Sequence, residues 1–118
     1  MRILLATEVY SPSVGGTERH VEHLADALIA AGHHVVVATT SPAAPAGPPD
    51  PAHVRRLTGW SHVVIRRRAR PEQVFHPPAA DPGTVAQLAE LIRNERPEVV
   101  HAHGWIAHSA VPAAARCE

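Results

Sequence analysis

Two short apolar runs separated by one amphipathic stretch occupy the first forty residues, and this order constrains the fold more than any other feature. Residues 2–7 and 34–40 are largely apolar without alternation, which is typical of strands buried on both faces of a parallel sheet. Between them, apolar residues recur at helical spacing: Val21, Leu24, Ala25, Leu28 and Ile29. The sequence therefore predicts a βαβ unit, whose crossover is right-handed in nearly all proteins.

Suitable residue types stand at both ends of this predicted helix. We expect Thr17 to cap the first turn and Glu18 to favour the positive end of the helix dipole. Gly32 supplies the left-handed residue that commonly ends a helix.

The middle of the chain carries a loop and a second strand–helix pair. Residues 41–51 hold five of the twelve prolines, so we expect a Pro/Ala-rich loop over residues 41–53. Residues 62–65 are a candidate third strand. Asp81 and Pro82 form an N-cap and first-turn pair for a second helix that ends at Pro97. Its apolar stripe is Val85, Leu88, Leu91 and Ile92.

A fourth strand over residues 98–103 and the start of a third helix over residues 105–118 complete the pattern. This order predicts an α/β fold, a Rossmann-like open parallel sheet with flanking helices, as one partial domain over residues 1–118. With the usual strand order 3-2-1-4, ligands bind in the crevice at the carboxyl ends of strands one and four. The loop after residue 7 and the end of residues 98–103 meet there.

Composition excludes several classes of protein. All eleven basic residues are arginine, and without lysine there is no Schiff-base, Walker-type or receiver-domain chemistry. Equal numbers of acidic and basic residues argue against a general nucleic-acid binder. The single Cys117 rules out a disulfide framework and favours a reducing, cytoplasmic location. No apolar run approaches the ~18 residues of a membrane-spanning helix.

Gly15 and Gly16 immediately precede the first predicted helix. Unpaired N–H groups and the helix dipole favour anions there, and the absence of side chains allows a phosphate or sugar to approach the backbone. The pair lacks the spacing of a dinucleotide fingerprint or a P-loop, so a simple turn remains an alternative.

His101 and His103 alternate on the fourth predicted strand, so their side chains point to the same side. Three interpretations stay open: a metal site, packed histidines without a functional role, and contact with a ligand. No carboxylate adjoins the pair as a third metal ligand. His103, next to Gly104, is the better placed for a ligand. The other histidines, including His20 and His23, are expected to be solvated or to cap helices.

A cluster of arginines is the one concentrated charge feature. It consists of Arg66, Arg67, Arg68 and Arg70, joined by Arg55 and Arg56. One interpretation is a solvated edge strand, whose charges prevent pairing with another strand. The alternative is that the cluster binds anionic lipid headgroups. Without interleaved aromatic residues, nucleic-acid recognition has no support.

Several segments, in order, resemble one family over nearly the whole chain. They are residues 2–5, Tyr10-Ser11-Pro12, residues 15–21, Leu24-Ala25, residues 32–35 and residues 97–104. Together they resemble the N-terminal lobe of family 4 retaining glycosyltransferases with the two-lobed GT-B fold. Each segment is ordinary alone, and the ensemble is specific.

The resemblance implies transfer of a sugar from a nucleotide-sugar donor to an acceptor hydroxyl with retention and without a metal. Gly15 and Gly16 would approach the donor phosphates and sugar, and His103 would be the catalytic candidate that contacts the donor sugar. Glu18 and Tyr10 would lie on the acceptor side, and His101 would face the sheet as support.

In this family the positive groups that stabilise the departing diphosphate belong to the C-terminal lobe. We therefore expect an N-terminal fragment that is inactive alone, in the cytoplasm or peripheral to the inner face of the membrane through Arg66, Arg67, Arg68 and Arg70. The alternative hypothesis is a non-catalytic α/β ligand-binding module.

Overall fold

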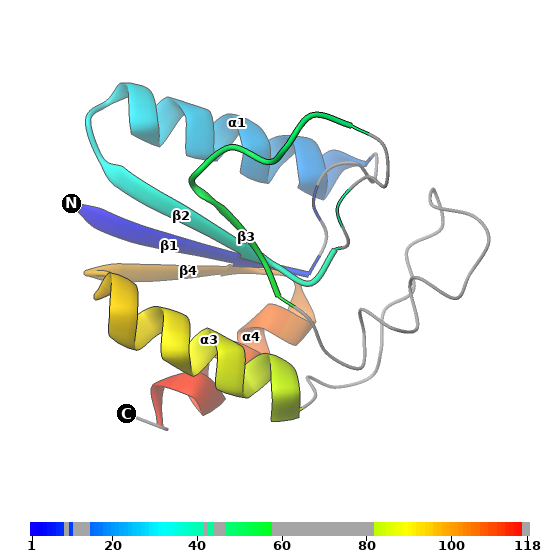
Figure 1. Ribbon diagram of the computed structural model, residues 1–118, viewed down its shortest axis with the longest axis vertical. Coiled ribbons are helices and arrows are strands. Elements are labelled where there is room, and N and C mark those ends of the chain that lie inside the picture. Colours follow the sequence, from blue (N-terminus) through cyan, green and yellow to red (C-terminus); the bar gives the residue numbers. More distant parts are fainter. Residues whose placement is uncertain (9, 11–14, 42, 44–46, 58–81, 117–118) are drawn as a thin grey trace.

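The computed structural model describes residues 1–8, 10, 15–41, 43, 47–57 and 82–116 (Figure 1). Within them the strands are β1 (Arg2–Thr7), β2 (His34–Thr39), β3 (Val54–Arg56) and β4 (Val99–His103), and the helices are α1 (Gly16–Ala30), α3 (Pro82–Glu95) and α4 (Trp105–Ala115). The strands form one parallel sheet in the order β3-β2-β1-β4. The predicted Rossmann-like α/β fold is confirmed, and so is the predicted order of β2, β1 and β4; β3 is a different segment from the predicted third strand.

Helices cover both faces of the sheet, which explains the continuous apolar runs. In Figure 1, α1 lies on one side of the sheet, and α3 and α4 lie on the other. Successive residues of β1 alternate between two cores: Leu5 packs with Val21 of α1, whereas Leu4 packs with Leu88 and Ile92 of α3. Leu4 and Leu5 are both fully buried, so β1 is fixed from both sides.

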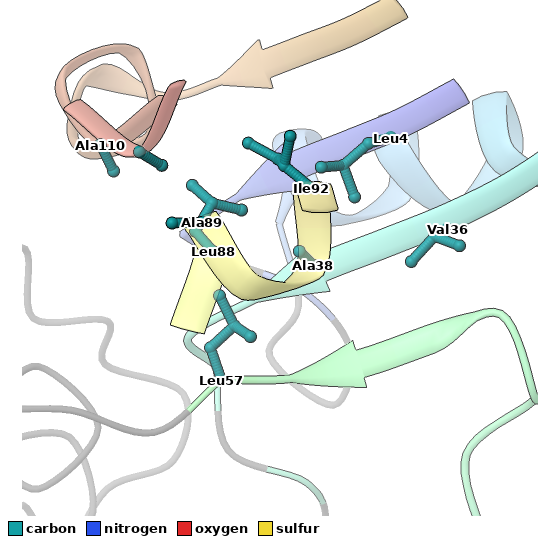
Figure 2. Close-up of a cluster of buried hydrophobic side chains, with 9 residues drawn as sticks. Leu4, Val36, Ala38, Leu57, Leu88, Ala89, Ile92 and Ala110 are labelled. Carbon is teal, nitrogen blue, oxygen red and sulfur yellow. The ribbon is translucent and has the colours of Figure 1, made fainter. Parts of the chain in front are cut away.

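Figure 2 shows the core on the α3 and α4 side, where Leu4, Leu88 and Ile92 converge. Leu57, which follows β3, and Ala110 of α4 belong to the same cluster. Burying a leucine or isoleucine side chain contributes about 1.5–3 kcal/mol, so the cluster holds both helices against the strands.

The first βαβ unit matches its prediction except at the start of its helix. Gly32 adopts a φ of 92° just after α1, as expected for a left-handed stop. Thr17 does not cap the helix: the N-cap residue is Gly15, in an extended conformation with no side-chain hydrogen bond. The predicted apolar stripe is narrower than expected, because Ile29 is 40% exposed.

β3 lies in a segment where no strand is expected from the sequence. It contains Val54, Arg55 and Arg56, and the backbone N–H of Leu57 continues its ladder by donating to the Thr39 carbonyl at 2.7 Å. Two arginines in three residues hide the apolar signal, since only Val54 of the strand is buried. The predicted strand at residues 62–65 lies outside the described residues.

The second half follows the predicted order. α3 ends at Glu95, and β4 spans Val99–His103, one residue shorter than expected. Asp81, the expected cap of α3, lies outside the described residues. Of the predicted loop at 41–53, the described residues form no helix or strand.

Candidate functional site

The carboxyl ends of β2, β1 and β4 meet at one edge of the sheet. Thr7 at the end of β1 is in register with Thr39 of β2 on one side and with His103 of β4 on the other. The chain crosses from β1 to β2 by way of α1, whereas α3 leads into β4 on the opposite face. The strand order therefore reverses between β1 and β4, where open α/β sheets bind ligands.

Three histidines gather at this edge. The ring centroids of His101 and His103 are 4.2 Å apart, and the ring of His20 lies 5.7 Å from that of His103 in an edge-to-face arrangement at 61°. His101 and His103 share a side of β4, as alternation predicts. α1 packs on β1 and β2, so this side of β4 is less covered, and His101 is exposed. Its ring lies against His103.

Glu8 joins the ends of β1 and β4. Its side chain is buried, and its carboxylate lies against Gly104, the N-cap residue of α4. A Cβ added at Gly104 would lie 2.9 Å from the Cδ of Glu8 and closer still to one carboxylate oxygen. Gly104 also has φ 88° and ψ 157°, a region that is essentially restricted to glycine. This position therefore requires glycine for both space and conformation.

Glu18 occupies the corresponding place at the start of α1. Its side chain is buried although it stands in the first turn of a helix, and its carboxylate lies where a Cβ of Gly15 would be. The carboxylate lies at the positive end of the helix dipole, as the sequence predicts. Gly16, which follows Gly15, is exposed, and none of the described atoms lies within 4 Å of the position that its Cβ would take.

Tyr10 is part of the core on the α1 side and is only 5% exposed. Its carbonyl accepts a hydrogen bond from the Ser41 hydroxyl at 3.0 Å, and the Arg56 guanidinium lies 5.5 Å from its ring centroid. Burial, assisted by the carboxylates of Glu22 and Asp26, raises the pKa of the Tyr10 phenol. Its acceptor-binding role stays a prediction.

Arg56 fastens the loop that precedes β3. It donates two hydrogen bonds to the Asp50 carboxylate, both at 3.0 Å, and a third to the Ser41 carbonyl. These bonds hold the pKa of Asp50 below its usual range. Arg56, which the sequence places in the arginine cluster, therefore has a local structural role.

The described part of the site contains no metal-ligand group and includes a small hollow. No group of three histidine, cysteine or acidic residues there is arranged to hold a metal ion. On the α3 side of the same edge, Thr7, Glu8, Thr40 and Thr84 help to line a hollow of about 20 Å³. It has room for about one water molecule, so a sugar would have to bind elsewhere.

The sequence does not predict the part that two residues play at this edge. His20 is exposed, as expected, but its ring contact with His103 is not predicted from the sequence. Its place near the start of the helix that follows β1 was the available signal. Glu8 directly follows a buried strand, the position from which α/β sheets present polar residues to ligands.

Four arginines of the predicted cluster lie outside the described residues: Arg66, Arg67, Arg68 and Arg70. Among the described helices, none has the length and apolar character needed to cross a membrane.

Comparison with known proteins agrees with these features. The model of the family described as Glycosyltransferase Family 4 matches residues 14–117. The glycogen synthases of Mycobacterium tuberculosis strains CDC 1551 / Oshkosh and ATCC 25618 / H37Rv are each 35% identical over 125 residues, covering 94% of this chain and 30% of theirs. A phosphatidylinositol N-acetylglucosaminyltransferase subunit from Arabidopsis thaliana is 31% identical over 104 residues, covering 87% of this chain and 22% of its own.

The chain therefore spans less than a third of the length of these curated relatives. The family match covers the glycine turn (Gly15 and Gly16) and the end of β4, the two features that the fold brings to one edge. On this match and on its Rossmann-like fold, the chain belongs to Glycosyltransferase Family 4.

Proposed function

We propose that this chain forms the acceptor-side lobe of a retaining glycosyltransferase, which transfers a sugar from a nucleotide-sugar donor to an acceptor hydroxyl. The contact between His20 and His103 is the observation that carries this proposal. It joins the helix that begins at the glycine turn to the end of β4, which supports a common site for both candidate segments at this edge of the sheet. A neutral imidazole has one donor and one acceptor nitrogen, which suits His103 to contact a sugar hydroxyl.

The names of the relatives support sugar transfer and differ in the acceptor. One is a glycogen synthase, and another is named for N-acetylglucosamine and phosphatidylinositol. We therefore propose a hexosyl-type transfer and leave the acceptor at the level of a hydroxyl compound. Tyr10 and Glu18 remain the proposed acceptor-side residues.

The charges at this edge of the described sheet indicate that the departing diphosphate is stabilised by a lobe other than this one. A departing nucleotide diphosphate needs positive charge. Here the carboxylates of Glu8 and Glu18 lie beside Gly104 and Gly15, at the starts of α4 and α1. Two carboxylates oppose a diphosphate, so we propose that a second lobe of the complete enzyme stabilises it, without a metal, and that this chain alone is inactive.

Nuclear magnetic resonance tests this assignment on the chain itself. UDP-glucose, ADP-glucose and UDP-N-acetylglucosamine would be titrated to millimolar concentration while histidine ring and glycine amide signals are followed. We expect the His103, Gly15 and Gly16 signals to shift, and those of His34, at the opposite end of β2, to stay fixed. If all three donors leave His103 unmoved, its role is contradicted.

A transfer assay with radiolabelled donors tests whether this chain alone is inactive. The chain alone should give no product above the level of a His103→Ala variant. Turnover that depends on His103 would contradict the proposed need for a second lobe.

We further propose a cytoplasmic enzyme that touches the inner face of the membrane through Arg66, Arg67, Arg68 and Arg70. Co-sedimentation with anionic and with neutral liposomes tests this contact.

A further inference from the structure

The torsional preferences of the His103 side chain do not by themselves fix the orientation of its imidazole ring. The χ2 torsion of histidine is broad and roughly two-fold, so the positions of the two ring nitrogens depend on neighbouring groups. His103 is partly buried, and its Nε2 atom is enclosed. The groups that touch the ring therefore decide which nitrogen faces a ligand.

Among the described residues, two imidazoles from different elements touch this ring. His101, two residues earlier on β4, lies at a centroid distance of 4.2 Å with the rings tilted by 42°. His20 approaches from α1 at 5.7 Å and 61°. An edge-to-face contact sets the positive edge of one ring against the negative face of the other, which favours one relative orientation.

We propose that His20 is a positioning residue that fixes the imidazole orientation of His103. His101 belongs to the same strand and moves with His103, whereas His20 belongs to the helix that begins at the glycine turn. His20 therefore holds the ring of His103 in a fixed relation to Gly15 and Gly16. The importance of this orientation for sugar transfer rests on the proposed function, and the orientation itself does not.

His20 is well suited to substitution because it lies outside the core. Its side chain is exposed, whereas the next residue, Val21, is fully buried against the sheet. His23 is a matched control: it is an exposed histidine on the same helix, and the described residues include no ring contact to it. Loss of the His20 ring should thus leave the fold intact.

The test follows the His103 ring by histidine-selective NMR in the ligand-free full chain. The variants are His20→Ala, His20→Phe and His23→Ala, with unfolding by urea as the check on folding. His20→Ala should shift the ring signals of His103, change the ratio of its two tautomers and remove the nuclear Overhauser effects that define χ2. His20→Phe, which keeps an aromatic edge, should restore those effects, and His23→Ala should change none of them.

Equal effects of His20→Ala and His23→Ala on the His103 ring would overturn the proposal, as would a ring that is unchanged in His20→Ala. A donor titration of the unmodified chain separates this failure from that of the proposed function. Donor-dependent shifts of His103 that survive unchanged in His20→Ala refute only the positioning role. A ring reoriented in His20→Ala but unmoved by every donor refutes only the contact between His103 and the donor.

Discussion

Replacing Gly104 by alanine tests the join between β1, β4 and α4. The backbone of Gly104, at φ 88° and ψ 157°, lies in a region where other residues cost about 1–3 kcal/mol. The new Cβ would also overlap the buried Glu8 carboxylate, whose displacement from a favoured rotamer costs about 0.5–1.5 kcal/mol. We expect the free energy of unfolding to fall by about 1.5–4.5 kcal/mol.

Urea denaturation followed by circular dichroism measures this change. With a slope of about 2 kcal/mol per M, the unfolding midpoint of Gly104→Ala should fall by ~1–2 M without a change in slope. Gly16→Ala is the matched control, because it stands in a helix at ordinary φ and no described atom lies within 4 Å of its Cβ position. It should be neutral or stabilise the chain by up to about 1 kcal/mol.

A double-mutant cycle separates the two causes at Gly104. Glu8→Ala removes the overlap and leaves the backbone conformation unchanged, so the double variant should be more stable than the sum of the two single changes predicts. The expected coupling is about 0.5–1.5 kcal/mol, the steric part of the estimate. Strict additivity would refute the steric argument. A loss below about 0.5 kcal/mol in Gly104→Ala alone would refute the whole explanation.

Two further substitutions test the loop before β3 and the outer strand. Because its pKa is lowered in the folded state, Asp50 stabilises the chain above its unfolded pKa of about 3.9, and this contribution disappears as pH falls through the folded value. Asp50→Asn should thus cost about 0.5–1 kcal/mol in urea melts at pH 7, and this cost should shrink as the pH is lowered below about 3.9. Val99 is 42% exposed on β4, one of the two edge strands of the described sheet, so Val99→Lys should reduce light scattering from concentrated samples, and unchanged scattering would contradict edge-to-edge association through β4.

Fold class is predictable from this sequence because burial on both faces leaves a clear pattern. Both β1 and β2 need an apolar residue at nearly every position, since Leu4 and Leu5 face different cores. α1 needs one apolar stripe, and residue 32 needs a left-handed conformation that glycine supplies. Each of these requirements restricts residue type locally, so the order of these elements along the chain follows from them, whereas the strand order follows from the usual topology of Rossmann-like sheets.

β3 escapes prediction because it is stabilised by contacts with residues elsewhere in the chain, which leave no pattern of residue types within the strand itself. Only Val54 of the strand is buried, and Arg56 is held by Asp50 and by the carbonyl of Ser41. A polar strand anchored in this way has the same composition as a charged loop. The contact between His20 and His103 is equally hard to predict, because it depends on how far α1 extends beyond the end of β4.

The two glycines of the glycine turn, Gly15 and Gly16, differ in what surrounds them and in how a ligand could approach them. Gly15 has a φ of −176°, which any residue adopts, so the backbone does not require glycine there, and a side chain would instead have to displace the Glu18 carboxylate. An incoming anion would have to displace that carboxylate to reach Gly15. At Gly16 none of the described atoms competes for the same space. With respect to the described residues, a ligand that contacts the backbone of the glycine turn therefore has its open approach at Gly16, while the absence of a side chain at Gly15 leaves room for the Glu18 carboxylate.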